Sequence, residues 1–258
     1  MSTILLTIKN KVATITLNRP DKFNAFNREM AISLQEKIEE CRTNQGVRAI
    51  VLSGNGKAFC AGQDLSEAID DNGIELPDIV EKHYNPIIQK IRNIEKPVVC
   101  AVNGVAAGAG ANIALACDIV VAHENVSFIQ AFSKIGLIPD SAGTFFLPRL
   151  IGMQKATAFM MLGDKVSASE AEELGMIYKV FPVDEFEKKS TQLAEKLASM
   201  PTKGLGLTKR LLNESWTNNL EQQLLREKEV QTEAGKTFDY QEGVNAFLEK
   251  RKPEFKGE

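Results

Sequence analysis

The chain has 258 residues, of which 43% are hydrophobic and 25% charged, a composition typical of a soluble globular protein. Its formal net charge of -3 argues against a general nucleic-acid binder, because such proteins usually carry a strong basic excess. No apolar run approaches the roughly 18 residues that span a bilayer, and residues 1–11 lack the apolar core of a signal peptide. We therefore expect a cytoplasmic protein that binds neither nucleic acid nor membrane.

The N-terminal part alternates strands with long helices. Residues 4–8 and 12–17 flank a polar turn and predict a hairpin, and the alternation of Ala13, Ile15 and Leu17 with threonines predicts a half-buried strand. The further elements predicted up to residue 102 are a helix at 28–43, a strand at 47–52, a helix at 78–94 that is kinked or broken at Pro86, and a strand at 97–102.

The second half becomes increasingly helical. A glycine-rich turn, Gly104 to Gly110, precedes a small-residue helix at about 109–117 and leads towards Asp140. The elements predicted around and after it are strands at 118–122, 127–129 and 177–181 and helices at 144–162 (interrupted near Pro148 and Gly152), 169–174, 183–199, 203–213, 218–235 and 239–250. The strand–strand–helix rhythm predicts an α/β fold, with a core domain at residues 1–200 and a helical C-terminal region at 201–258.

Cysteine and histidine usage excludes several kinds of chemistry. The four cysteines lack CxxC spacing, so we expect free thiols, mostly buried. With only His83 and His123 present, a histidine metal site or a Ser-His-Asp triad is poorly supported.

Two small-residue turns could each present a free backbone N–H. The glycine-rich turn is not a P-loop, and Ile113 stands where a dinucleotide fingerprint needs its third glycine. A second turn surrounds Gln63, where Asp64 could equally be an ordinary helix cap. Either turn alone is compatible with simple strand–helix packing. Together, two convergent N–H groups would form an oxyanion hole.

A single acid follows these turns. Asp140 could transfer protons near an oxyanion site, or it could cap the helix that begins near Ala142. Cys60 and Ser141 are possible nucleophiles, but no base is evident near either of them.

Taken in order, these motifs resemble the crotonase family of enoyl-CoA hydratases and isomerases. The matching segments are Asn18-Arg19-Pro20, Asn24-Ala25, Ala58 to Leu65, Lys96 to Gly104, Gly108-Ala109-Gly110, Cys117-Asp118, Leu162-Gly163-Asp164 and Ala168 to Ala171. The resemblance implies a spiral of strand–strand–helix repeats, a helical trimerisation region, trimers often paired into hexamers, and acyl-CoA thioester substrates. It implies no metal and no cofactor beyond the coenzyme A of the substrate.

The resemblance also assigns roles to residues. The oxyanion donors would be the backbone N–H groups of Gln63 and Ala109, and Asp140 would be the catalytic acid–base. Ala109 departs from the glycine usual at its position, which is acceptable if its backbone angles are allowed. The substrate-binding positions would be Lys22, Ala25, Ala61, Asp64, Leu65, Gly110, Phe132, Phe247 and Lys250, of which Phe247 and Lys250 would reach the adenine held by a neighbouring subunit.

The carboxylates narrow the expected reaction. Typical hydratases carry two glutamates, and the matching positions here hold Asn112 and Phe132, neither of which transfers protons. The segment 131–144 and the tail around Gly204 to Leu207 and 239–251 are similar to a branch of the family, the ring-epoxide isomerases. That similarity implies conversion of 1,2-epoxyphenylacetyl-CoA to oxepin-CoA, with 3,2-enoyl-CoA isomerisation as a side activity. An enoyl-CoA hydratase and a non-catalytic acyl-CoA-binding protein are the alternatives.

Overall fold

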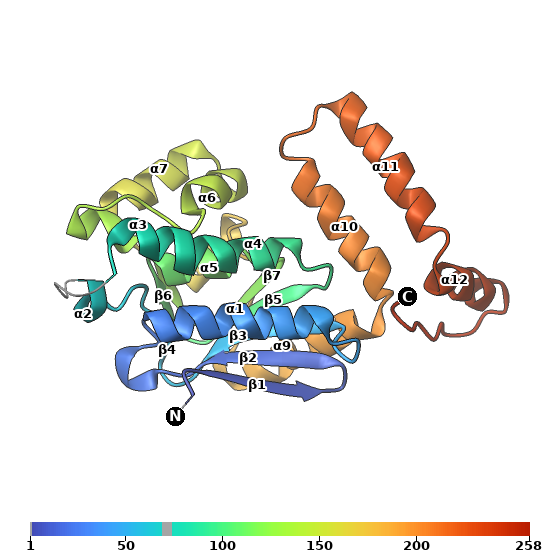
Figure 1. The fold of residues 1–258 in the computed structure, drawn as a ribbon, viewed down its shortest axis with the longest axis horizontal. Helices are drawn as coiled ribbons and strands as arrows, with labels where there is room; N and C mark the ends of the chain where they lie inside the picture. Colours follow the sequence, from blue (N-terminus) through green and yellow to red (C-terminus); the bar gives the residue numbers. More distant parts are fainter. Residues whose placement is uncertain (1, 69–73) are drawn as a thin grey trace.

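The computed structural model describes residues 2–68 and 74–258, which form two β-sheets and a projecting helical hairpin (Figure 1). The strands are β1 (Ile4–Lys9), β2 (Val12–Leu17), β3 (Ala49–Gly54), β4 (Ala58–Cys60), β5 (Val98–Val102), β6 (Val105–Ala107), β7 (Ile119–His123), β8 (Ser127–Ile129), β9 (Lys165–Ser167) and β10 (Lys179–Phe181). The α-helices are α1 (Arg28–Thr43), α2 (Leu65–Ala68), α3 (Leu76–Asp78), α4 (Asn85–Asn93), α5 (Ala109–Leu115), α6 (Gly143–Ile151), α7 (Met153–Leu162), α8 (Ala168–Glu173), α9 (Val183–Ser199), α10 (Thr202–Glu214), α11 (Leu220–Ala234) and α12 (Phe238–Leu248). Three further segments are the 3-10 helices η1 (Pro20–Lys22) and η3 (Ala131–Ile135) and the π-helix η2 (Ile79–Tyr84).

The larger sheet has the order β1-β2-β3-β5-β7-β10, and the smaller one β4-β6-β8-β9. Within residues 2–68 and 74–258, the pairs β1–β2 and β8–β9 are antiparallel and the other strand pairs in both sheets are parallel. Strands β3, β5 and β7 of the larger sheet are each followed directly by β4, β6 and β8 of the smaller sheet, and then by helix. The predicted strand–strand–helix rhythm is therefore confirmed.

The larger sheet is covered on both faces. Ile50 and Leu52 of β3 belong to the main apolar cluster, which includes residues of α1 and α4, whereas Ala49 and Val51 pack on the other side against α9. Because both faces are buried, these parallel strands read as continuous apolar runs rather than as alternating ones. All four cysteines are free and buried, as expected from the sequence.

Two details of the sequence-based prediction were wrong. Strands β4, β6 and β9 were not predicted, because each has only three residues and lies beside a turn of glycine or other small residues, which hides the strand pattern. Pro148 does not interrupt its helix: α6 runs through it to Ile151 and ends at Gly152, whose φ is 78°. The proline removes one backbone hydrogen bond, and the short helix continues without it. Near Pro86, the predicted break corresponds to the change from the π-helix η2 to α4.

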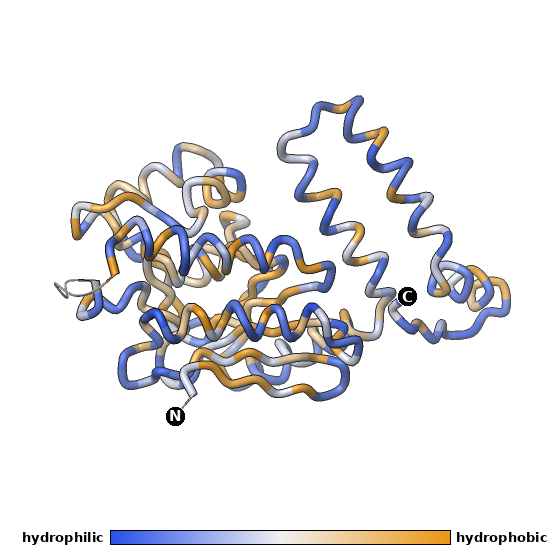
Figure 2. Tube along the Cα trace, in the orientation of Figure 1, coloured by the Kyte–Doolittle hydropathy of each residue, from blue (hydrophilic) through white to orange (hydrophobic). Residues whose placement is uncertain are grey.

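The hairpin of α10 and α11 projects from the body, with α12 and the C-terminus at its foot (Figure 1). Apolar and hydrophilic positions alternate along both hairpin helices (Figure 2). Helix α9 ends at Ser199 and α10 begins at Thr202, close to the predicted boundary at residue 200, although the division into two domains stays a prediction. None of the helices in the described part of the chain is long and apolar enough to cross a bilayer.

Candidate functional site

The two turns singled out in the sequence lie side by side. Strands β4 and β6 are parallel neighbours, so the turns that follow them emerge at the same edge of the smaller sheet. Gly62, with a φ of 96°, lies so close to the second turn that a Cβ atom built on it would lie 3.7 Å from the backbone nitrogen of Ala109. The structure thus brings Gln63 and Ala109 together.

Both turns leave a backbone donor unused. Within residues 2–68 and 74–258, the N–H groups of Gln63 and Ala109 donate to no acceptor, whereas the N–H of Asp64 donates to Phe26 and that of Gly108 to Ile129. Ala109 is the first residue of α5 and has helical backbone geometry, so an alanine fits where the family usually has glycine. Two neighbouring unpaired N–H groups can receive a negatively charged oxygen.

Residues 19–26 form one wall beside Gln63. The backbone N–H of Ala61 donates to Phe23 at 3.0 Å, and Phe26 forms an isolated bridge with Gln63. Ala25 is buried in this wall, Lys22 is exposed at the end of η1, and Leu65 is 51% exposed. The predicted binding positions of this part of the chain are therefore neighbours in space.

Asp64 and Gly110 have structural roles in this arrangement. The Asp64 carboxylate forms an ion pair with Arg19 at 2.9 Å and accepts from Ser66, and these contacts lower its pKa. The ordinary interpretation of Asp64 as the cap of α2 is thus confirmed. Gly110 packs on Cys60, since a Cβ atom at Gly110 would lie 2.6 Å from the Cys60 side chain.

Asp140 is a partly buried carboxylate in a tight turn before α6. Burial raises its pKa to about 6, while a hydrogen bond from the Ser141 hydroxyl, at 2.9 Å, opposes the shift. The N-cap of α6 is Ala142, and no side chain in the described part of the protein caps this helix, so the interpretation of Asp140 as a helix cap is wrong. A base with a pKa near neutrality suits reversible proton transfer.

The turn after Asp140 has unusual backbone geometry. Ser141 and Ala142 have φ angles of 50° and 58°, in the left-handed region that non-glycine residues seldom adopt. Such residues persist where the surroundings hold them in place, and they occur often at functional sites. The Asp140 carbonyl accepts here from the N–H of Gly143 at 2.9 Å and from the amide of Asn112 at 2.8 Å.

Phe132, one of the predicted binding positions, lies beside the glycine-rich turn. A Cβ atom on Gly108 would lie 3.8 Å from the Phe132 ring. Phe128 is buried in the core, and the rings of Phe145 and Phe146 pack on Trp216, with centroids 5.0 Å and 5.4 Å away.

Two predicted residues lie away from this cluster. Phe247 and Lys250 belong to α12 and the residues after it, at the foot of the hairpin, whereas α5 lies within the body (Figure 1). One chain does not bring them to Gln63 and Ala109. Cys60 is unsuited to act as a nucleophile, because complete burial raises its pKa to about 12.

Tyr84 is a residue of the site that the sequence did not reveal. It is 1% exposed, and its hydroxyl donates to the Gln63 side chain at 2.5 Å. Burial, followed by the negative charge of Asp140, raises the pKa of this phenol. The sequence did not indicate a role for Tyr84, because the residue lies in an ordinary apolar helix pattern. The π-helical turn that orients its side chain cannot be recognised from the sequence.

Comparisons with known proteins show the family to which the chain is similar. The family model described as enoyl-CoA hydratase/isomerase matches residues 7–258. The chain is 46% identical to 1,2-epoxyphenylacetyl-CoA isomerase of Escherichia coli, covering 100% of this chain and 99% of the relative. It is 34% identical to 2,3-dehydroadipyl-CoA hydratase of the same organism, with 100% of both chains covered. The crystal structure of an enoyl-CoA hydratase from Bacillus anthracis matches with a TM-score of 0.92 at 32% identity, over 99% of this chain and 100% of that one.

Proposed function

Since the chain belongs to the enoyl-CoA hydratase/isomerase family, we propose that it is an acyl-CoA isomerase in which Asp140 transfers protons and two backbone N–H groups hold the thioester oxygen. The observation that carries this proposal is the pairing of a single carboxylate of raised pKa with two unpaired, adjacent N–H donors. Asn112 and Phe132 occupy the positions at which hydratases of the family carry glutamates, so activation of water by a glutamate pair is not available.

The proposed chemistry conserves every atom of the substrate. The Asp140 carboxylate removes a C2 proton from a 3-enoyl thioester, and the electron pair moves onto the carbonyl oxygen. The N–H groups of Gln63 and Ala109 stabilise the developing enolate. Each contributes about 3 kcal/mol to stabilisation of the transition state. The protonated Asp140 then returns the proton to C4, and the double bond moves to C2–C3. No metal or redox cofactor is needed for this step.

The preferred substrate that we propose is 1,2-epoxyphenylacetyl-CoA, which rearranges to the isomeric oxepin-CoA. Identity of 46% over the full length to an enzyme of that name supports the assignment. The Phe132 ring beside the glycine-rich turn supports an aromatic acyl group, because aromatic rings pack favourably on one another. Lys22 would meet a phosphate of coenzyme A, and Phe247 and Lys250 would reach the adenine from another subunit of a trimer or hexamer.

The test compares isomerisation of 3-hexenoyl-CoA with hydration of crotonyl-CoA, for the unmodified protein and for Asp140→Asn. This substitution keeps the size of the side chain and removes the base, so we expect isomerisation to fall at least about a hundredfold. Asp184→Asn, at an exposed position in the first turn of α9, is the matched control and should retain full activity. Turnover of the epoxide is then measured with the same three proteins.

Full isomerase activity in Asp140→Asn would show that another group is the base. Fast hydration of crotonyl-CoA by the unmodified protein would instead support the hydratase alternative. Binding of acyl-CoA without turnover of any of the three substrates would support the non-catalytic alternative.

A further inference from the structure

The carbonyl of Asp140 is held by a chain of two buried side-chain amides. Asn112 is fully buried in α5, and its Nδ2 donates to the Asp140 carbonyl at 2.8 Å. The Asn112 Oδ1 in turn accepts from Nε2 of Gln130 at 2.8 Å, and Gln130 is only 3% exposed. We call this pair the amide relay.

The relay has one possible polarity. A backbone carbonyl only accepts, so Asn112 must turn its NH2 group towards Asp140 and its oxygen towards Gln130. Gln130 must therefore supply an NH2 group, which leaves its own Oε1 without a partner among the described residues.

Asn112 also fixes the start of α6. A Cβ atom on Gly143 would lie 2.3 Å from the Asn112 Nδ2, so the Asn112 amide packs directly against the Gly143 backbone. Between Asp140 and Gly143 lie the two residues with left-handed backbone angles. The relay therefore contacts both ends of the turn whose geometry sets the direction of the Asp140 side chain.

We propose that Asn112 is a positioning residue for Asp140 and that Gln130 orients Asn112, an inference that rests on the proposed function of Asp140. The relay holds the turn through the main chain and leaves the carboxylate free to take up and release a proton. A lysine or arginine in place of Asn112 would add a positive charge beside Asp140 and favour the ionised form of the Asp140 carboxylate. A glutamate at position 112, as in the hydratases, would set a carboxylate against the Asp140 carbonyl unless it were protonated, so the relay and a hydratase glutamate exclude each other.

The test uses apolar side chains of similar shape, Asn112→Leu and Gln130→Met, and their combination. We expect kcat for isomerisation to fall roughly a hundredfold in Asn112→Leu and roughly tenfold in Gln130→Met, with KM within about twofold, because displacement of a reacting group by about 1 Å has effects of this size. If Gln130 acts through Asn112, adding Gln130→Met to Asn112→Leu should cause no further loss, because coupled sites are not additive. Ser127→Ala, a buried hydroxyl of β8 without a partner in the described chain, is the control and should retain full kcat.

Amide hydrogen exchange gives a readout that does not depend on the reaction. The Gly143 N–H, which donates to the Asp140 carbonyl, should exchange at least about tenfold faster in Gln130→Met and at the unmodified rate in Ser127→Ala. Unchanged exchange together with unchanged kcat in Gln130→Met would overturn the relay, as would additive losses in the double variant. Faster exchange in Gln130→Met combined with full activity in Asp140→Asn would reject the proposed function and keep the structural relay. If Gln130→Met does not fold, Gln130→Leu is measured in the same way.

Discussion

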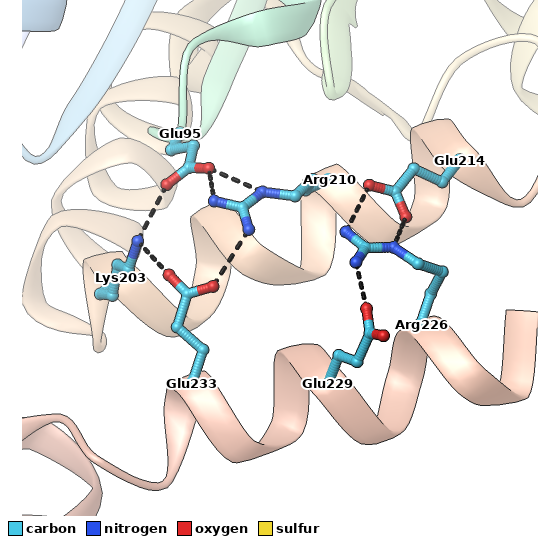
Figure 3. A network of polar contacts seen from close by, with 7 residues as sticks. All are labelled: Glu95, Lys203, Arg210, Glu214, Arg226, Glu229 and Glu233. Carbon is cyan, nitrogen blue, oxygen red and sulfur yellow. Dashed lines mark hydrogen bonds and ion pairs between the residues drawn. The ribbon is translucent and has the colours of Figure 1, made fainter.

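The turn that carries Asp140 is held by uncharged groups, whereas the C-terminal hairpin is attached through ion pairs. Around Asp140 the contacts are two side-chain amides, one hydroxyl and one backbone N–H, and within the described residues no cation forms an ion pair with its carboxylate. Figure 3 shows the opposite arrangement in the hairpin: Glu95 and Glu233 share Lys203 and Arg210, while Arg226 bridges Glu214 and Glu229.

The difference follows from what each region must do. An opposite charge within about 4–6 Å of a carboxylate lowers its pKa by one to three units, so a cation beside Asp140 would weaken the base that the proposed proton transfer needs. The hairpin has no such constraint, and its long charged side chains can bind the core through ion pairs. Changes to the hairpin should therefore alter stability, whereas changes to the relay should alter kcat.

The largest effect on stability should come from the ion pair that joins α10 to the larger sheet. Lys209 is nearly buried and donates to Asp118 at 2.8 Å, and Arg92 reaches the same carboxylate at 3.2 Å. Asp118→Asn leaves a buried ammonium without its anion, and we expect it to lower the free energy of unfolding by about 3–5 kcal/mol. Urea denaturation measures this change, and a loss below about 1 kcal/mol would show that the carbonyls around Lys209 suffice to hold it.

The next effect tests how closely α10 fits against the core. A Cβ atom on Gly206 would lie 2.4 Å from the Glu95 carbonyl oxygen, whereas one on Gly204 would have its nearest neighbour at 3.8 Å. Gly206→Ala should therefore destabilise the protein by about 2–3 kcal/mol, since either the helix or the Glu95 backbone must move. Gly204→Ala, two residues away on the same helix, should instead be neutral or stabilise by up to about 1 kcal/mol. Equal melting temperatures for the two variants would contradict the close approach.

How much of this could be predicted from the sequence differs between the two regions. The two turns at Gln63 and Ala109 and the position of Asp140 were predicted because ordered motifs mark the strands and turns that carry them, whereas the catalytic roles of these residues stay a proposal. The relay was not predicted: Asn112 was recognised only as unable to transfer a proton, and Gln130 is a single polar residue between a short strand and Phe132. Its partner lies 18 residues away, and only the pairing of β6 with β8 brings the two together.

The ion pairs of the hairpin were equally hidden. The sequence predicted helices at 203–213 and 218–235, but charges on a helix are usually solvated, and spacing does not reveal partners across the chain. Glu95 is more than 100 residues from Lys203 and Arg210 in sequence, with separations of 108 and 115. Contacts of this kind depend on how α4 and α10 pack, which local patterns do not encode.

The pH dependence of Asp140 distinguishes a functional acid from a structural one. A carboxyl group whose folded-state pKa is raised from 3.8 to about 6 stabilises the protein below pH 4, and this contribution is lost as the pH rises through 6. At pH 8 Asp140→Asn should therefore be more stable than the unmodified protein by about 3 kcal/mol, and the gain should shrink towards pH 5. Urea denaturation at several pH values measures this gain in stability. In the unmodified enzyme, kcat should decrease below about pH 6, because Asp140 becomes protonated there. A pH-independent difference would contradict a raised pKa.

The smallest effect is expected in the exposed part of the ion network. Glu233 accepts from Lys203 at 2.7 Å and from Arg210 at 3.1 Å, but its side chain is 42% exposed, and Glu95 still pairs with both cations when Glu233 is replaced. Glu233→Gln should therefore cost about 0.5 kcal/mol at low ionic strength, and the cost should vanish at about 1 M salt because screening weakens exposed pairs. Glu227→Gln, an exposed position of the same helix without an ion pair in the described chain, is the matched control.

The kcat loss in Gln130→Met should not change with salt, since interactions of neutral amides are hardly screened. If salt changed the kcat loss in Gln130→Met as much as it changed the stability loss in Glu233→Gln, the distinction between the two regions would not hold.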